Sequence, residues 1–272
     1  MKILVLGASG LLGSHLINNF KKKYRIVGPT RKCLDLSNKL TLKNIEKDFN
    51  VVIYCAQYRP SIDAPINLFE LEQVNGLFLK SLINYLPKLQ KIIYMSTGGL
   101  YENNDKLLSE SSPLKKNSEM SPYFVSKIRT EEMLLKFSTS IDVNILRIFT
   151  MYGVGAHPTS LMPRLKNKIV KQESIISSKN LGDRLRPVHV VDVVNVIEKL
   201  LSYRKNGVLN IGGPEVLFFR EMVNRIASYT EFEPIFDTSN VNQTTLAPDN
   251  KLLISSLYSP KIFFTGNWES NL

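Results

Sequence analysis

The chain has 272 residues, of which 43% are hydrophobic and 22% are charged, and its net charge is +11. These proportions are typical of a globular enzyme, and no apolar run reaches the roughly 18–20 residues that a membrane span needs. The sequence begins in an apolar run without the pattern of a signal peptide. We therefore expect no membrane span and no leader, and one α/β domain with a smaller appended lobe.

Cysteine usage and the basic charge predict a cytoplasmic protein with a small-molecule ligand. Cys33 and Cys55 form neither a CxxC pair nor a metal-ligand spacing, and disulfides are rare in the cytosol. We therefore expect reduced thiols and no metal. The cations are spread along the chain, as on a solvated basic surface; an alternative is that they attract a polyanionic ligand. No recognition motif accompanies them, so we expect no nucleic-acid partner.

Apolar strands alternate with helical patterns over the first 150 residues. Strands are expected at residues 3–6, 25–28, 51–56, 91–96 and 143–148, with helices at 11–20, 67–85 and 121–137. Such alternation builds right-handed βαβ units and a parallel sheet. The strands are apolar on both faces, as required when helices cover both sides of the sheet. The sequence thus predicts an α/β fold with a doubly wound parallel sheet.

The alternation loosens after residue 150. Helices are expected at 161–171, 191–203 and 218–229, an extended segment at 174–177, and a strand at 208–211 that rejoins the main sheet. Residues 178–182 show no regular pattern, and the last forty or so residues show a weak one. We therefore expect a dinucleotide-binding domain of residues 1–150 and 189–212, interleaved with a C-terminal substrate-binding lobe of residues 151–188 and 213–272.

The loop after the first strand carries three spaced glycines. Gly7 permits a tight turn, Gly10 lets the backbone approach a pyrophosphate, and Gly13 lets the next helix lie close to the strand. The N-terminus of that helix adds free N–H groups and a positive dipole end. The position of the loop between a strand and a helix predicts a dinucleotide site; the alternative is a glycine-rich turn without a ligand. The expected cofactor-binding residues of this loop are Gly7, Ser9, Gly10, Leu11, Leu12 and Gly13.

The end of the second strand indicates which dinucleotide is bound. The usual acidic residue for the adenosine ribose is absent, and Arg31 and Lys32 follow instead. A carboxylate would repel a 2′-phosphate, whereas Arg31 can bind one through a charge-assisted fork. The sequence therefore favours NADP over NAD as cofactor. The alternative is that both cations are solvated loop residues.

Tyr123 and Lys127 supply the groups needed to move a proton while a hydride moves. They lie four residues apart on a predicted helix and share one face. A free phenol titrates near 10, and a neighbouring ammonium lowers that pKa. Lys127 can also reach the nicotinamide ribose, and Thr97 at the end of the fourth strand can hold the substrate oxygen. Thr97, Tyr123 and Lys127 are therefore the candidate catalytic residues.

With these motifs the chain resembles the extended short-chain dehydrogenase/reductase family, in its nucleotide-sugar epimerase/dehydratase branch. The resemblance runs over most of the chain and implies a Rossmann-type fold. It implies that Asp35 and Leu36 meet the adenine, that Ala56 lies beside the cofactor, and that Asn75 belongs to a conserved helix element. It places Thr97 in the catalytic hydroxyl position. In the substrate elements it places Thr150 where the family has Asn, and leaves open whether Arg184 or Arg186 meets the substrate diphosphate, with Arg186 preferred.

Departures from the family pattern narrow the expected reaction. Members that dehydrate carry an Asp-Glu pair directly after the catalytic Thr, where this chain has Gly98 and Gly99. A Cys that some epimerising reductases use near this point is also absent. The resemblance therefore implies chemistry at C4 of a nucleotide sugar, either reduction of an NDP-4-keto-6-deoxyhexose or 4-epimerisation with retained NAD, as in UDP-glucose 4-epimerase. It further implies a homodimer through helices near 67–86 and 121–137.

A different class of function is a non-catalytic dinucleotide-binding regulator. Such relatives usually lack the Tyr or the Lys, and this chain has both. His15 and His189 are expected to be packing residues, and Trp268 to cap the smaller lobe.

Overall fold

The computed structural model describes residues 1–57, 67–116, 118, 120–178, 182–204, 206–238 and 244–269. The chain divides into two compact units. The first consists of Met1–Leu100, Leu114–Arg147 and Leu200–Leu209, and the second of Tyr101–Pro113, Ile148–Lys199 and Asn210–Leu272. The predicted assignment of residue ranges to cofactor and substrate stays a prediction. Part of the segment 178–182, expected to be irregular, lies outside the described residues.

The first unit is built on a six-stranded sheet of order β10-β5-β4-β3-β1-β2. Its strands are β1 (Lys2–Leu6), β2 (Arg25–Val27), β3 (Val51–Tyr54), β4 (Lys91–Thr97), β5 (Asp142–Ile148) and β10 (Gly207–Ile211). The pairings of β1 with β2 and β3, and of β3 with β4, are parallel. This confirms the doubly wound parallel sheet, and the place of β10 beside β5 confirms that residues 208–211 rejoin it.

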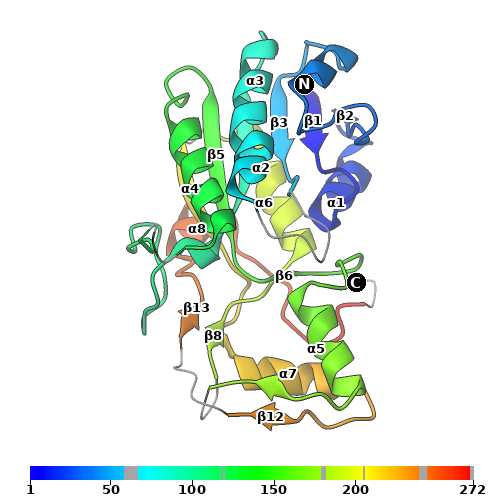
Figure 1. The fold of residues 1–272 in the computed structure, drawn as a ribbon, viewed down its shortest axis with the longest axis vertical. Helices are drawn as coiled ribbons and strands as arrows, with labels where there is room; N and C mark the ends of the chain where they lie inside the picture. Colours follow the sequence, from blue (N-terminus) through cyan, green and yellow to red (C-terminus); the bar gives the residue numbers. More distant parts are fainter. Residues whose placement is uncertain are drawn as a thin grey trace. The chain divides into compact units, whose positions relative to one another are not determined.

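Helices cover the sheet because its central strands are buried on both faces. All residues of β1 and β3 are buried, and helix α1 (Leu11–Phe20) buries Leu12, Leu16 and Phe20. Helix α4 (Pro122–Leu135) packs beside α2 (Leu68–Glu72), in front of the sheet in Figure 1. The single helix predicted at 67–85 consists of α2, a π-helical turn at Gln73–Leu77 and α3 (Phe78–Tyr85). A 3₁₀ turn at Lys39–Asn44 was not predicted.

The second unit combines four helices with three small sheets among its described residues. The helices are α5 (Leu161–Val170), most of α6 (Val190–Ser202), α7 (Phe219–Ala227) and α8 (Lys251–Ser256). The sheets have the orders β11-β8-β13, β12-β7 and β6-β9. Their strands are β6 (Met151–Tyr152), β7 (Ile175–Ile176), β8 (Arg184–Leu185), β9 (Val188–His189), β11 (Leu217–Phe218), β12 (Phe236–Asp237) and β13 (Thr245–Leu246). A core formed by residues of α5 and α7 includes Phe264 and Trp268, so Trp268 is a core residue of this unit.

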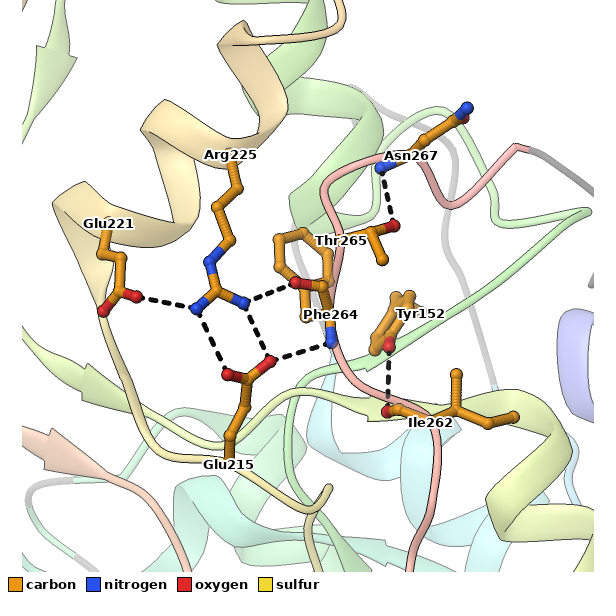
Figure 2. Close-up of polar contacts among 8 residues, drawn as sticks. All are labelled: Tyr152, Glu215, Glu221, Arg225, Ile262, Phe264, Thr265 and Asn267. Carbon is orange, nitrogen blue, oxygen red and sulfur yellow. Dashed lines mark hydrogen bonds and ion pairs between the residues drawn. The ribbon is translucent and has the colours of Figure 1, made fainter.

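The segment near Phe264 is fastened to α7 by an ion-pair cluster (Figure 2). Arg225 pairs with both carboxylate oxygens of Glu215 at 2.9 and 3.2 Å and with Glu221 at 2.7 Å. Glu215 also accepts the Phe264 N–H at 2.9 Å, and Arg225 donates to the Phe264 carbonyl at 2.6 Å. Bidentate pairing of this kind has a fixed geometry. The cluster therefore fixes the position of the segment near Phe264 relative to α7.

Candidate active site

The glycine loop lies where the strand order of the sheet reverses. The loop follows β1, and β1 lies between β2 and β3, which is the point at which doubly wound folds bind ligands. Gly7 has φ +83°, and a Cβ there would lie 2.7 Å from the Ala56 Cα, just past the end of β3. A Cβ on Gly13 would lie 2.1 Å from the Gly7 carbonyl oxygen. The fold itself therefore requires glycine at both positions.

Gly10 differs because nothing in the fold requires a glycine there. Its φ is −77°, which any residue adopts. An added Cβ would meet one atom, the Gly7 carbonyl oxygen, at 3.4 Å. A glycine that the chain itself does not need fits a position that a ligand approaches closely. The loop thus fits the pyrophosphate of a dinucleotide.

The N-terminus of α1 is suited to an anion. No side chain caps it, and its first turn has no acidic residue, so the positive end of the helix dipole is not neutralised locally. The Leu12 side chain is buried, so its backbone N–H is the group that can meet a ligand. Ser9 is exposed, and Ser9, Leu11 and Leu12 stay predicted cofactor-binding residues.

The segment after β2 exposes a cation. The Arg31 side chain is 84% exposed, and its Nε lies 4.0 Å from the Asp35 carboxylate. That carboxylate accepts hydrogen bonds from the Ser37 N–H at 3.0 Å and hydroxyl at 2.7 Å, which lower the pKa of Asp35. Leu36 and Ala56 pack on the main core. The Asp35 carboxylate is thus held by hydrogen bonds from Ser37, while the Arg31 side chain is exposed to solvent.

The structure brings the predicted catalytic side chains together at the end of β4. Helix α4 packs against β4 and the following turn Gly98–Leu100. Lys127 is buried, and its Nζ donates to the Met95 carbonyl oxygen at 2.8 Å, two residues before Thr97. The same Nζ lies 5.8 Å from the centroid of the Tyr123 ring. Thr97 Oγ1 accepts the Gly99 N–H at 3.2 Å, which fixes its hydroxyl at the strand end.

Burial makes the Lys127 ammonium more acidic than a surface lysine. Desolvation lowers the pKa of Lys127 to about 8, and the Glu131 carboxylate opposes this shift. Burial also raises the pKa of the neighbouring Cys55 thiol to about 12, so the thiol is neutral near pH 8. The lysine can therefore carry its charge near neutral pH in a poorly solvated place, where a charge acts strongly on its neighbours.

The Phe124 ring packs against the turn Gly98–Leu100 that follows Thr97. A Cβ on Gly99 would lie 2.9 Å from two ring carbons of Phe124 and 3.6 Å from Thr97 Oγ1. Lys115 Nζ lies 5.4 Å from the centroid of that ring and donates to the Gly99 carbonyl oxygen at 3.0 Å. The Phe124 ring thus fills the space into which a side chain at position 99 would extend.

Of the predicted substrate-binding residues, Thr97 and Tyr123 belong to the first unit, whereas Thr150 and Arg186 belong to the second. Thr150 has φ +34°, a strained backbone for a β-branched residue. Arg186 donates to the carbonyl oxygens of Gly213, Pro248 and Pro214 at 2.8, 3.0 and 3.2 Å. Arg184 donates to the Thr245 hydroxyl at 3.2 and 3.0 Å. Each arginine has further N–H groups, and the choice between them stays a prediction.

Buried polar residues behind the candidate catalytic group were not predicted from the sequence. Asn75, within the π-helical turn, donates to the Ser126 hydroxyl at 3.0 Å. Glu131 pairs with Arg147. Glu131 lies four residues after Lys127, and this spacing is the sequence signal that could have identified it. Among the described residues no group of three or more His, Cys, Asp or Glu side chains is placed to hold a metal ion. No helix in that part of the chain is long and apolar enough to cross a membrane.

A doubly wound parallel sheet with a glycine loop at its reversal point defines a Rossmann-type protein, the class that binds dinucleotides. Within that class, residues 3–212 match the model of the NAD dependent epimerase/dehydratase family. The chain belongs to this family, whose members are enzymes of the short-chain dehydrogenase/reductase type. This confirms the family and the enzyme class expected from the sequence.

The similar proteins include one curated relative and two solved structures. The chain is 27% identical to a GDP-6-deoxy-D-talose 4-dehydrogenase from Aggregatibacter actinomycetemcomitans over 74% of this chain and 70% of the relative. It resembles UDP-glucuronic acid 4-epimerase from Bacillus cereus in complex with NAD (TM-score 0.80, 23% identity, 99% and 96% coverage). It equally resembles RMD from Pseudomonas aeruginosa complexed with NADPH (TM-score 0.80, 19% identity, 99% and 97% coverage).

Proposed function

We propose that this enzyme is a nucleotide-sugar oxidoreductase that acts at C4 and reduces an NDP-linked 4-keto-6-deoxyhexose. The observation that carries this proposal is the buried Lys127 ammonium, held near Thr97 and facing the Tyr123 ring. The relative from Aggregatibacter actinomycetemcomitans adds support, because its name describes redox chemistry at C4 of a 6-deoxy sugar.

Each of the three side chains has a separate task in this chemistry. A bound nicotinamide dinucleotide supplies the hydride that adds to C4 of the ketone. Tyr123 donates its phenolic proton to the C4 oxygen, so that the ketone becomes a hydroxyl. The Lys127 ammonium stabilises the phenolate that remains, and the Thr97 hydroxyl holds the oxygen in line.

The turn after Thr97 argues against dehydration. Gly98 and Gly99 offer no carboxyl or carboxylate for a second acid–base step. The Phe124 ring also fills the space that a side chain at position 99 would need. Simple hydride and proton transfer at C4 is the chemistry that these residues support.

For the cofactor we propose NADP(H) in preference to NAD(H). The exposed Arg31 guanidinium follows β2, and a bidentate contact to a 2′-phosphate contributes about 1.5–3 kcal/mol. Arg31→Ala is expected to weaken NADPH binding by about tenfold or more and to leave NADH binding unchanged, with Lys32→Ala as the matched control. Tighter binding of NADH than of NADPH by the wild type would refute this choice.

The second candidate function is 4-epimerisation. It is favoured by the structural likeness to a UDP-glucuronic acid 4-epimerase in complex with NAD. An epimerase returns the hydride to the same carbon and therefore benefits from retaining its cofactor, whereas a reductase must release its cofactor after every turnover.

Absorbance of NADPH distinguishes the two candidates. The enzyme is mixed with an NDP-4-keto-6-deoxyhexose and NADPH. Tyr123→Phe is the matched control, because its ring still packs but has no hydroxyl proton to donate. Loss of one NADPH per sugar supports the reductase. Interconversion of two 4-hydroxy sugars without added cofactor would establish the epimerase instead.

Three further expectations belong with this function. We propose that Thr150 and Arg186 bind the nucleotide sugar. A homodimer through the helices near 67–86 and 121–137 is supported by exposed apolar side chains, namely Phe69 of α2, Leu77 of the π-helical turn and Leu135 of α4. Sedimentation of the wild type against Phe69→Glu tests the dimer. The cytoplasmic location stays a prediction.

A further inference from the structure

Helix α4 directs a stripe of three functional side chains at the end of β4. Tyr123, Lys127 and Glu131 follow one another at intervals of four residues, so they share one face of the helix. Lys127 holds the Met95 carbonyl oxygen at 2.8 Å, and the Ser96 hydroxyl donates to Glu131. The two residues that directly precede Thr97 are therefore both held by side chains of α4.

Arg147 of β5 holds Glu131 in place. Its Nη2 and Nε donate to the two carboxylate oxygens at 2.6 and 3.2 Å, and both side chains are almost completely buried. A fork of this kind fixes the orientation of a carboxylate as well as its charge. Well-packed apolar residues often replace a buried ion pair without loss of stability. Stability alone is therefore a weak explanation for charge at this place.

The titratable groups that face Lys127 come from α4, from β4 and from the end of β3. Tyr123 and Glu131 face it from α4, Tyr94 from β4, where its ring centroid lies 4.6 Å from Nζ, and Cys55 from the end of β3. Burial raises the pKa values of Cys55 and Tyr94, so both are neutral near neutral pH. Among these groups Glu131, paired with Arg147, is the anion that offsets the desolvation of Lys127.

We propose that Glu131, held by Arg147, is a positioning residue of the active site. It fixes the strand end that carries Thr97, and its charge favours the ammonium form of Lys127. This inference rests on the proposed function only in that Thr97 and Lys127 act there.

The first test measures the pH dependence of NADPH binding by fluorescence, with no sugar present. Affinity is expected to fall as the wild-type pH rises through about 8, because Lys127 loses its charge there. Glu131→Gln keeps an oxygen for Ser96 but loses the charge, and should move this midpoint down by roughly one pH unit. Glu72→Gln is the matched control, because Glu72 of α2 pairs at the surface with Arg129 of α4, the helix that carries Glu131; it should leave the midpoint unchanged.

A second variant separates charge from folding. Glu131→Gln removes the carboxylate charge that pairs with the buried Arg147 guanidinium, which can itself destabilise the protein. The double variant Glu131→Gln/Arg147→Met removes both charges and should melt near the wild type while keeping a lowered midpoint. Ser96→Ala should lower kcat with an unchanged midpoint, because it removes the contact to the strand and keeps the charge.

Two outcomes would overturn the inference. One is a folded double variant with the wild-type midpoint; the other is a wild-type affinity that does not change between pH 6 and 10. Failure of the proposed function has a different signature, namely that the wild type does not oxidise NADPH in the presence of an NDP-4-keto-6-deoxyhexose.

Discussion

The three glycines of the first loop meet different constraints. Glycine is required at positions 7 and 13 because an added Cβ would overlap the chain itself. At position 7 it would lie 2.7 Å from the Ala56 Cα, and at position 13 it would lie 2.1 Å from the Gly7 carbonyl oxygen. Gly10 has room for a Cβ and an ordinary φ. Glycine is therefore required by the fold at positions 7 and 13, whereas at position 10 its proposed role is to let a ligand approach.

This difference predicts opposite phenotypes for two alanine variants. Gly10→Ala should melt within about 2 °C of the wild type, since it costs little in the folded chain, but should bind NADPH about tenfold or more weakly because the methyl meets the pyrophosphate. Gly13→Ala should instead be clearly less stable than the wild type, because its methyl group would overlap the Gly7 carbonyl oxygen. Thermal melts and fluorescence titrations measure both effects, and undiminished NADPH affinity in Gly10→Ala would contradict the assignment.

The buried Lys127 predicts a pH-dependent stability. Its pKa is about 8 in the folded chain against 10.5 as the ordinary value. Between these two pH values the unfolded chain binds the extra proton, so folding stability rises with pH. Below pH 8 the buried ammonium costs about 3 kcal/mol, at about 1.4 kcal/mol for each pH unit between the two values.

Lys127→Met is therefore expected to be more stable than the wild type at pH 7 and to lose most of that advantage by pH 10.5. Urea denaturation at the two pH values measures the difference. An advantage of equal size at both values would show that the ammonium is not the cause.

At the scale of elements, local patterns predicted the first unit well. Helix α1 occupies residues 11–20 as expected, and β1, β3, β4 and β5 differ from expectation by one or two residues at their ends. Buried parallel strands and amphipathic helices have strong periodic signals. The π-helical turn at Gln73–Leu77 has no such signal, since its residues continue the helical pattern while Asn75 turns toward Ser126.

Strand β7 lies within the extended segment expected at 174–177, but the other short strands of the second unit could not be predicted from local sequence. Each has two residues, and its partner is distant in the chain, as when Leu217 pairs with Leu185. The same limit applies to the site. Tyr123 and Lys127 can be recognised by their spacing. The role of Glu131 depends on its ion pair with Arg147, and that of Phe124 depends on its position beside Gly99. Tertiary packing creates both contacts, so local sequence does not reveal them.

The connection between β5 and β6 stores strain at Thr150. A β-branched residue at φ +34° is disfavoured by about 1–3 kcal/mol, and Asn and Gly tolerate this conformation better. Thr150→Asn and Thr150→Gly should raise the free energy of unfolding by about 1 kcal/mol, while Thr150→Val should not. Denaturant titration checks this, and a loss of stability in Thr150→Asn would show that Thr150 makes contacts that outweigh the strain.

At the scale of the whole molecule, the family match ends at residue 212. The later residues of the second unit are organised by their own polar contacts. Asp192 of α6 accepts the Tyr258 hydroxyl at 2.7 Å and the Ile262 N–H at 3.0 Å, and Glu215 accepts the Phe264 N–H (Figure 2). Residues 258–264 are thus held to the second unit by the buried Asp192 carboxylate and the half-buried Glu215 carboxylate.

The central claim is that hydride reaches C4 of a nucleotide-linked sugar while Tyr123 supplies the proton. It is tested most directly with NADPH that carries deuterium at both hydrogen positions of the nicotinamide C4 and with an NDP-4-keto-6-deoxyhexose, followed by mass spectrometry of the sugar. We predict one deuterium at the sugar C4 for each NADPH oxidised, and a rate at least about 10²-fold lower in Tyr123→Phe. An unlabelled product, or full activity in Tyr123→Phe, would contradict the claim.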